Sequence, residues 1–300
     1  MNQFVHLHIH TEFSLVDGIC RISQLVDHAK RLEMQSIAIT DVANIYGAVK
    51  FYRKCVMRGI KPIIGVDLAV ANAQKFPQNP RLILLCRNNK GYRFICKLLS
   101  KLHMGLGQGN ELIVDKNFLK EGSENLIVLS GGLSGDIGHA LRSEKIDLAE
   151  ELIYEYKEFF PDSFYLEITR TGAPDEEKYL NSLVPLAIKT RTPLVASNNV
   201  RYINEGEYEA HEIRVCINEG RILDDPRRPR LYTEQQYLRT PNAMIKLFSD
   251  LPSAVENTNH IAKRCNVFLD FDDVHMPRMP IDKAAEANAT LEENAQNGLL

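Results

Sequence analysis

The stretch VHLHIHTEFSLVDG, residues 5–18, places two histidines on one face of a short extended segment near the N-terminus. His8 and His10 are two residues apart, and side chains at that spacing in a β-strand point to the same side. Asp17 precedes Gly18, where a turn can bring a carboxylate back towards the two imidazoles. Imidazole and carboxylate together suit zinc, manganese or iron, so the stretch is a candidate metal site. Two histidines alone do not define such a site, and a merely polar strand is the simpler interpretation.

The composition is that of a globular chain with room for one large α/β domain or two smaller ones. The 300 residues are 44% hydrophobic and 25% charged, with a net charge of −3, so contact with DNA would have to come from local patches. The six cysteines form no CxxC pair, which favours reduced thiols and a cytoplasmic location. The sequence shows no signal region and no apolar run near the roughly 18 residues of a membrane helix, so we expect no membrane contact.

Apolar strands alternate with amphipathic helices along the chain. We predict seven strands, at about 4–9, 36–40, 63–70, 82–86, 126–130, 164–170 and 193–200. Helical periodicity occurs between strands at 22–32, 47–58, 92–102, 146–160 and 176–189. Strands joined through helices predict right-handed crossovers and a mostly parallel sheet. Seven or eight such units close most naturally into a barrel, and an open doubly wound sheet is the alternative.

Polar residues fall at or near the C-terminal ends of these strands, and this placement favours the barrel. In a barrel those ends meet at one mouth, where active sites are built. Junctions between strands and loops are generally polar, so part of the pattern needs no functional explanation. The positions are His8, His10, Asp41, Asp67, Gly131, Gly132, Glu167, Arg170, Asn198 and Asn199.

Eight motifs occur in order along roughly residues 3–280. They are VHLHIHTEFSLVDG, AITDVANIYGAVKFYRKC, GIKPIIGVD, LLCRNNKGYRFICKLLS, LSGGLSGDIG, VASNNVRYI, AHEIRVCINEGRILDDPRRPRLYTEQQYL and VENTNHIAKRCNV. This set resembles the N-terminal PHP (polymerase and histidinol phosphatase) domains of the α subunits of bacterial DNA polymerase III. The resemblance implies a distorted seven-stranded (β/α) barrel with C-terminal helices that lead towards a polymerase core. It predicts a PHP domain over residues 1–278 and the truncated start of the following polymerase (palm or thumb) region over residues 279–300.

The resemblance also implies a nine-residue cluster that holds up to three metal ions, and this chain departs from it. His8, His10 and Asp17 match the cluster, and Asp67 stands where a glutamate is usual. At the other five positions the usual metal ligand is absent. These positions are Val42, Arg81, Gly132, Asn199 and Arg201.

The two arginines change the electrostatics expected of the cleft. Carboxylates and neutral imidazoles make a cluster of metal ions tolerable, whereas a guanidinium repels them. We therefore predict that Arg81 and Arg201 pair with Asp17, Asp41 and Asp67 where metals would otherwise lie. Without a metal-activated water such a cleft would not catalyse hydrolysis. The site is expected to be vestigial, with no firm cofactor and at most low occupancy by zinc or manganese on His8, His10, Asp17 and Asp67.

The most basic local stretch is RILDDPRRPR, residues 221–230. Its arginines, Arg221, Arg227, Arg228 and Arg230, could contact DNA phosphates or an acidic partner, above all the last three. The alternative, which we favour, is that they pair with nearby carboxylates and brace the domain. Those carboxylates belong to Glu219, Asp224 and Asp225.

Two further histidines are expected to be structural. His6 lies on the same strand face as His8 and His10, and we expect it to be packed or hydrogen-bonded. His211 lies in EAHEIRV, where an HExxH metal helix would need a second histidine in place of Val215.

The resemblance implies a parent protein that synthesises DNA on a primer-template with Mg²⁺, within a holoenzyme that includes a sliding clamp. For this chain it implies a catalytically inactive scaffold that supports the polymerase and docks the proofreading 3′–5′ exonuclease (epsilon) subunit. No catalytic residue is expected among these 300 residues. The alternative is an active metal-dependent phosphoesterase, or a 3′–5′ exonuclease, that uses a partial metal site.

Overall fold

The chain forms two compact units, Met1–Phe268 and Leu269–Leu300. The structure, a computed structural model, describes residues 4–71, 76–105, 112–273 and 284–299. The predicted domain boundary between residues 278 and 279 lies outside the described residues and stays a prediction. The smaller unit contains one described helix, α11 (Ala284–Asn297), and the larger unit contains every other described element. No described helix is long and apolar enough to cross a membrane.

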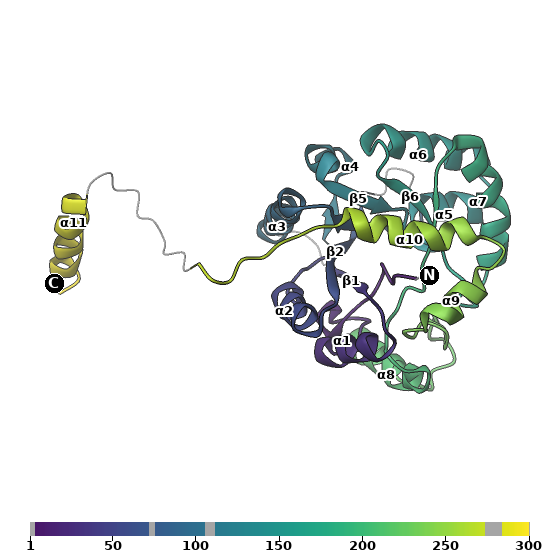
Figure 1. Cartoon of the computed structure of the whole chain (residues 1–300), viewed down its shortest axis with the longest axis horizontal. Coiled ribbons are helices and arrows are strands. Elements are labelled where there is room, and N and C mark those ends of the chain that lie inside the picture. The colour runs from purple at the N-terminus through teal and green to yellow at the C-terminus, as the bar shows by residue number, and fades with distance from the viewer. Residues whose placement is uncertain (1–3, 72–75, 106–111, 274–283, 300) are drawn as a thin grey trace. The chain divides into compact units, whose positions relative to one another are not determined.

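One curled, mixed sheet forms the centre of the larger unit (Figure 1). Its strands follow the order β1-β2-β3-β5-β6-β7, with β4 beside β2. Neighbouring strands are parallel except at β3, which runs antiparallel to both β2 and β5. The strands are β1 (Ser36–Val42), β2 (Lys61–Val70), β3 (Arg81–Cys86), β4 (Ile113–Val114), β5 (Leu126–Leu129), β6 (Phe164–Ile168) and β7 (Leu194–Ala196).

The curled α/β sheet agrees with the predicted distorted barrel, and most of its strand pairs are parallel as expected, with β3 as the exception. A parallel neighbour needs a crossover of a dozen or more residues, usually a helix. Only about ten residues separate the end of β2 from the start of β3, too few for such a crossover. The chain therefore turns back, and β3 pairs with β2 in the opposite direction.

The predicted first strand, residues 4–9, is an extended segment outside the seven named strands. On one side its carbonyls accept from β1, with Ala38 N to His6 O at 3.0 Å and Thr40 N to Ile9 O at 2.8 Å. On the other side Ile9 makes a parallel bridge with Val200, beyond the end of β7. The segment thus lies between the two edge strands of the curled sheet. The structure also contains β4, a short strand that the sequence did not predict, so the number of named strands is still seven.

All five helices expected between strands form, and they cover the outside of the sheet (Figure 1). They are α1 (Ile22–Arg31), α2 (Ala48–Arg58), α3 (Asn89–Met104), α6 (Ile146–Phe159) and α7 (Glu176–Thr190). The remaining helices of the larger unit are α4 (Lys116–Leu119), α5 (Asp136–Arg142), α8 (Tyr208–Glu219), α9 (Pro241–Leu247) and α10 (Pro252–Arg264). Four short 3-10 turns are η1 (Glu12–Ser14), η2 (Lys120–Asn125), η3 (Gly132–Ser134) and η4 (Glu205–Glu207).

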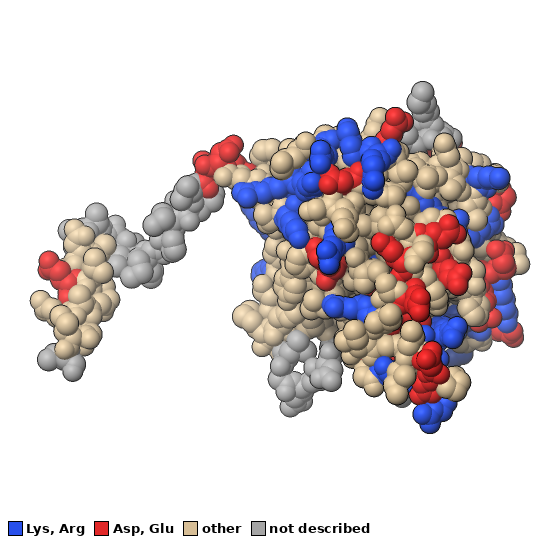
Figure 2. Space-filling model, turned by 90° about the horizontal axis from the view of Figure 1, so that it is seen from below, with Lys and Arg blue, Asp and Glu red and all other residues tan. Residues whose placement is uncertain are grey.

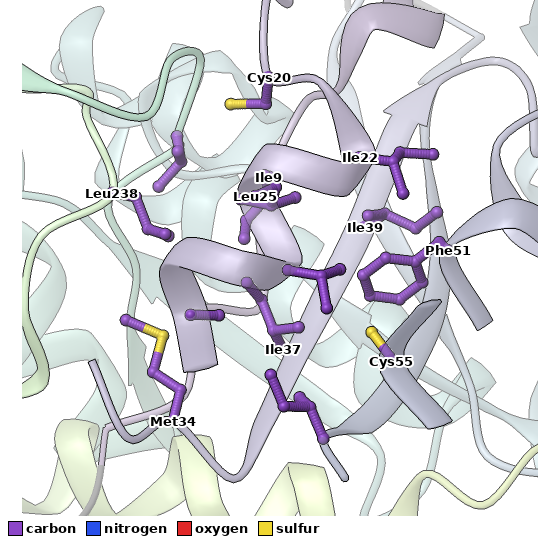
Figure 3. Close-up of a cluster of buried hydrophobic side chains, with 14 of the residues drawn as sticks. Ile9, Cys20, Ile22, Leu25, Met34, Ile37, Ile39, Phe51, Cys55 and Leu238 are labelled. Carbon is purple, nitrogen blue, oxygen red and sulfur yellow. The ribbon is translucent and has the colours of Figure 1, made fainter. Parts of the chain in front are cut away.

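Two hydrophobic cores lie on opposite faces of the sheet. Because alternate strand residues face opposite sides, Ile37 and Ile39 of β1 point outward while Ala38 points inward. The outward pair packs with Leu25 of α1 and Phe51 of α2 in the cluster of Figure 3. The inner core takes one face of each long strand and is joined by residues of α10. Its members are Val5, Leu7, Ala38, Ile63, Ile83, Leu85, Ile127, Leu129, Tyr165, Val195, Ile261, Ala262 and Cys265.

Helix α10 closes one end of this inner core. Lys61, the first residue of β2, donates from Nζ to the carbonyl of Ala262 at 2.7 Å, and Asn257 donates to the carbonyl of Leu194 at 2.7 Å. These contacts place α10 at the N-terminal ends of the parallel strands. Their C-terminal ends, where the predicted polar residues fall, lie at the opposite end.

Candidate functional site

Buried polar side chains gather at the strand ends opposite α10. His8 and His10 come from the extended N-terminal segment, Asp67 from β2 and Glu167 from β6, and all four are less than 5% exposed. Arg81 reaches the same end because β3 runs antiparallel to β2, with Arg81 paired to Ala69 near the end of β2. The cleft is therefore built from segments far apart in the sequence.

Three of these side chains lie close enough to hold one metal ion. The Nε2 atoms of His8 and His10 are 3.1 Å apart, and Oδ2 of Asp67 lies 3.9 Å from the first and 3.4 Å from the second. One ligand atom from each residue lies within 4.8 Å of the others. Ligands of a tetrahedral zinc ion at 2.0–2.1 Å are about 3.3 Å apart. The spacing of this trio fits one ion.

Glu167 orients His8 within the trio. Nδ1 of His8 lies 2.8 Å from Oε1 of Glu167, and the hydroxyl of Ser197 donates to the same oxygen at 2.5 Å. Burial alone would lower the pKa of His8, but the carboxylates of Glu167 and Asp67 raise it to about 9. The sequence placed Glu167 at a strand end without assigning it to the cluster. The feature of the sequence that could have indicated this role is a carboxylate within the otherwise apolar strand FYLEI.

Arg81 neutralises Asp67 directly. Its Nε donates to Oδ1 of Asp67 at 2.9 Å, and its Nη2 donates to the carbonyl of the same residue at 3.3 Å. Burial would raise the pKa of Asp67, yet the guanidinium and then the two histidines hold it well below the usual range. One oxygen of the candidate ligand is thus already engaged by a cation.

Arg201 makes the second buried ion pair. Its Nη1 donates to Oδ2 of Asp17, and the same oxygen accepts from the hydroxyl of Tyr232 at 2.9 Å. The guanidinium lies over the Tyr232 ring, 5.3 Å from its centroid. Burial would raise the pKa of Asp17, but Arg201 and then His10 lower it far below its usual range. Sequence reasoning missed Tyr232, which lies about thirty residues from Arg201 with no pattern that links them.

Arg201 also contacts His10. Its Nη1 lies 2.9 Å from Nδ1 of His10, and because a guanidinium has only donors, this contact is a hydrogen bond when that nitrogen offers its lone pair. In the neutral ring the proton then lies on Nε2, the atom that faces His8 and Asp67. A protonated nitrogen cannot bind a metal ion. The spacing of the trio fits one metal ion, and Arg81 and Arg201 contact two of its members.

Two of the expected ion pairs are present, but the expected role of Asp41 was wrong. Its Oδ1 accepts from the backbone of Thr11 at 2.6 Å and the hydroxyl of Ser14 at 2.7 Å. Its Oδ2 accepts from the Thr11 hydroxyl at 2.7 Å. Asp41 thus holds the turn after the two histidines instead of pairing with an arginine.

The three uncharged positions where a ligand is absent lie around the same cleft. Val42 is the register partner of Asp67 in the β1–β2 pair, and it has no ligand atom in its side chain. Gly132 opens η3 with φ 56°, and a Cβ there would come 3.9 Å from the carbonyl of Glu167. Asn199 also has positive φ, 43°, and its carbonyl accepts from the Gln236 amide at 3.1 Å.

Two arginines of RILDDPRRPR form ion pairs, one of them with a partner that the sequence did not indicate. Arg227 pairs with Asp225 at 3.1 Å, as expected. Arg228 instead pairs with Glu212 of α8 at 2.6 Å, and both side chains are buried. Arg230 is exposed.

His211 is the neighbour of Glu212 on α8, and its Nε2 lies 2.9 Å from the carbonyl of Asp17. Helix α8 therefore contacts both Arg228 of the arginine-rich loop and Asp17 of the cleft. His211 and His6 both have structural contacts. Nε2 of His6 lies 2.8 Å from the carbonyl of Arg239.

Comparison with known proteins agrees with this geometry. The PHP domain family matches residues 6–171. DNA polymerase III subunit alpha of Pseudomonas aeruginosa is 46% identical over 277 residues, which are 92% of this chain and 24% of that protein. The subunit alpha of Escherichia coli K12 is 44% identical over 279 residues, 93% of this chain and 24% of that protein.

Among solved structures, a two-domain protein from Bacteroides vulgatus with a predicted PHP-like metal-dependent phosphoesterase aligns over 84% of this chain and 63% of that one. Its TM-score is 0.44 and its sequence identity is 11%. The chain spans about a quarter of the length of the two curated relatives. The family match covers more than half of the chain and includes His8, His10 and Asp67. The chain therefore belongs to the PHP domain family.

Proposed function

We propose that this chain is the PHP domain of a DNA polymerase III α subunit, within a parent protein that performs template-directed DNA synthesis. Support comes from the two relatives named above, which match nearly the whole chain at more than 40% identity. In this proposal the Mg²⁺, the primer-template DNA and the sliding clamp belong to other parts of the parent protein and its holoenzyme.

We infer that the cleft is a structural core of this domain and not a hydrolytic centre. The observation that carries the inference is the pair of arginines that engage Asp67 and Asp17. These two carboxylates each have a guanidinium as counter-ion, so a metal that binds either of them would have to compete with an arginine. Breaking a buried ion pair typically costs about 3–5 kcal/mol, which opposes metal entry.

Metal content tests this directly. After incubation with zinc or manganese and thorough desalting, the chain is expected to retain less than about one ion per ten molecules by mass spectrometry. Arg201→Gln is expected to raise zinc retention. A glutamine can accept as well as donate, so Nδ1 of His10 can carry the proton and Nε2 becomes free to bind.

The matched control is Arg170→Gln, which removes an arginine paired with Asp250 at 2.6 Å outside the cleft. It should leave metal retention unchanged. Stoichiometric zinc or manganese on the unaltered chain would overturn the vestigial cleft.

The hydrolase alternative is favoured by one observation, the spacing of His8, His10 and Asp67 with Glu167 behind His8. It predicts release of p-nitrophenol from bis-p-nitrophenyl phosphate in the presence of Mn²⁺, abolished by His8→Ala. Our proposal predicts that the unaltered chain releases p-nitrophenol no faster than the His8→Ala variant does. Activity that survives purification and is lost in that variant would establish the alternative.

We also propose that the domain docks the proofreading 3′–5′ exonuclease subunit of the same polymerase. The proposal follows from the resemblance of the eight motifs and from the scaffold role of a cleft that is filled by ion pairs. Size-exclusion chromatography of the chain with that subunit is expected to give a complex in which the two proteins are present in equal amounts. Separate elution at micromolar concentration would contradict it.

Exposed apolar side chains on two helices allow the docking surface to be located. Ile217 of α8 is 72% exposed and Met57 of α2 is 81% exposed, and neither is needed for the cores. Ile217→Lys and Met57→Lys each introduce one charge on a separate face. Loss of the complex in one variant and not in the other would identify the face that the exonuclease subunit contacts.

A further inference from the structure

Positive charge is concentrated in one part of the chain. Between Val42 and Asn110 there are twelve lysines and arginines and a single acidic residue, Asp67, in a chain whose net charge is −3. Asp67 is buried in the cleft and paired with Arg81. The surface that this segment contributes therefore carries no carboxylate of its own.

Helix α3 carries a stripe of four basic residues along its exposed side. Lys90, Arg93, Lys97 and Lys101 follow one another at spacings of three, four and four, which places them on one helix face. All four are exposed, while the other face of α3 contributes buried residues to the fold. The helix contains no acidic residue. We call these four residues the α3 stripe.

The α3 stripe differs from most charged surfaces of the molecule in lacking counter-ions. Within the described residues, Lys90, Arg93 and Lys97 have no ion-pair partner. On the neighbouring α2, by contrast, Lys54 and Arg58 share Asp27 of α1 at 3.1 and 2.7 Å. Among the described residues, no ion pair compensates the positive charge of these three side chains.

Figures 1 and 2 show the side of the larger unit on which α2 and α3 lie and the distribution of charge over one face. Helices α2 and α3 lie together on the left of the larger unit in Figure 1. Figure 2 is turned about the horizontal axis, so its left is the same side, and blue side chains gather at its upper left. Red side chains are more frequent towards the centre and right of that face.

We propose that the α3 stripe is a binding surface for the phosphate backbone of duplex DNA. At 1.5 Å per residue the stripe extends over about 16 Å, and duplex DNA carries one negative charge per about 1.7 Å of axis. Single-stranded nucleic acid would also require exposed aromatic side chains for stacking, but Tyr92 and Phe94 of α3 are half-buried. A helix face of lysines and arginines suits backbone contact without sequence preference.

Fluorescence anisotropy with a labelled duplex of about 20 base pairs tests the proposal on the full 300-residue chain. The unaltered chain is expected to bind two unrelated sequences equally, with an affinity that falls as salt rises. The triple variant Lys90→Glu, Arg93→Glu, Lys97→Glu should bind at least about tenfold more weakly. The slope of its plot of log affinity against log salt concentration should be smaller in magnitude by about 3, because three phosphate contacts are lost.

The matched control makes the same change in net charge elsewhere. Lys145→Glu, Arg191→Glu, Lys246→Glu replaces three exposed basic residues outside α2 and α3 and should leave the affinity within about twofold. Absence of binding by the unaltered chain at low salt, or equal losses in both triple variants, would overturn the proposal. So would competition by polyglutamate as strong as by DNA at equal charge, since that would indicate an acidic protein partner.

Discussion

Arg201 shows how a side chain that only donates hydrogen bonds can decide what a histidine does. It lies between Asp17 and His10, and by donating to Nδ1 of His10 it turns the protonated Nε2 towards His8 and Asp67. A lysine or a glutamine at this position would impose a weaker constraint, since the first is a flexible point charge and the second can also accept. The chemistry of the cleft thus depends on one residue contributed from beyond the last strand.

His6 gives a pH dependence that can be separated from the cleft. Its ring is buried against Phe4, with centroids 4.8 Å apart, and its Nδ1 has no hydrogen-bond partner among the described residues. Burial lowers the pKa of His6 to about 4. The ring therefore stays neutral in the folded chain, while the unfolded chain takes up a proton below about pH 6.5. The contribution of the neutral His6 ring to the free energy of unfolding is therefore fully present above about pH 6.5. It is lost as the pH falls towards 4.

His6→Gln should remove this dependence, because the glutamine amide can still donate to the carbonyl of Arg239 but does not titrate. Between about pH 7.5 and pH 5 the unaltered chain should lose about 2 kcal/mol more of its free energy of unfolding than the variant. Urea denaturation at several pH values measures both. Parallel curves for the two proteins would show that His6 already carries its proton in the folded chain.

At the scale of elements, the direction of β3 decides the composition of the cleft. In a parallel strand Arg81, as its first residue, would lie at the end closed by α10. Because β3 is antiparallel, Arg81 instead lies beside Ala69, two residues beyond Asp67 on β2. The short connection before β3 therefore has a chemical consequence, since it brings the guanidinium to the carboxylate.

Helix α3, which follows β3, depends on its first cap. The Asn88 side chain accepts from the backbone of Lys90 at 2.9 Å and of Gly91 at 3.1 Å. Asn88→Ala leaves both donors without this partner and should lower the free energy of unfolding by about 1 kcal/mol. Asn88→Ser keeps a capping oxygen and should recover most of that loss. Chemical denaturation compares the three proteins, and equal destabilisation by both changes would contradict a capping role.

At the scale of the whole molecule, α10 completes the fold of the larger unit. Ile261, Ala262 and Cys265 fill the inner core at the strand ends opposite the cleft. All the described members of that core belong to the larger unit, Met1–Phe268.

Two truncations test this division. A chain that ends at Phe268 should keep the midpoint and cooperativity of unfolding of the 300-residue chain. A chain that ends at Leu251 loses α10, exposes the inner core and should show no cooperative transition. Circular dichroism against temperature distinguishes the two. Loss of the transition in the chain that ends at Phe268 would mean that the larger unit does not fold by itself.

The order of most elements, the helices and the identity of the family could be predicted from the sequence, because periodicity and ordered motifs are local properties. The proximity of His8, His10 and Asp67 was also predictable, since strand ends converge in a curled sheet. Only the tertiary structure decided which partners these groups have. Glu167 behind His8, Tyr232 on Asp17 and Glu212 on Arg228 are contacts between residues far apart in the chain. The partners of a buried charged group come from whichever segments the fold brings next to it. Local sequence patterns therefore do not predict them.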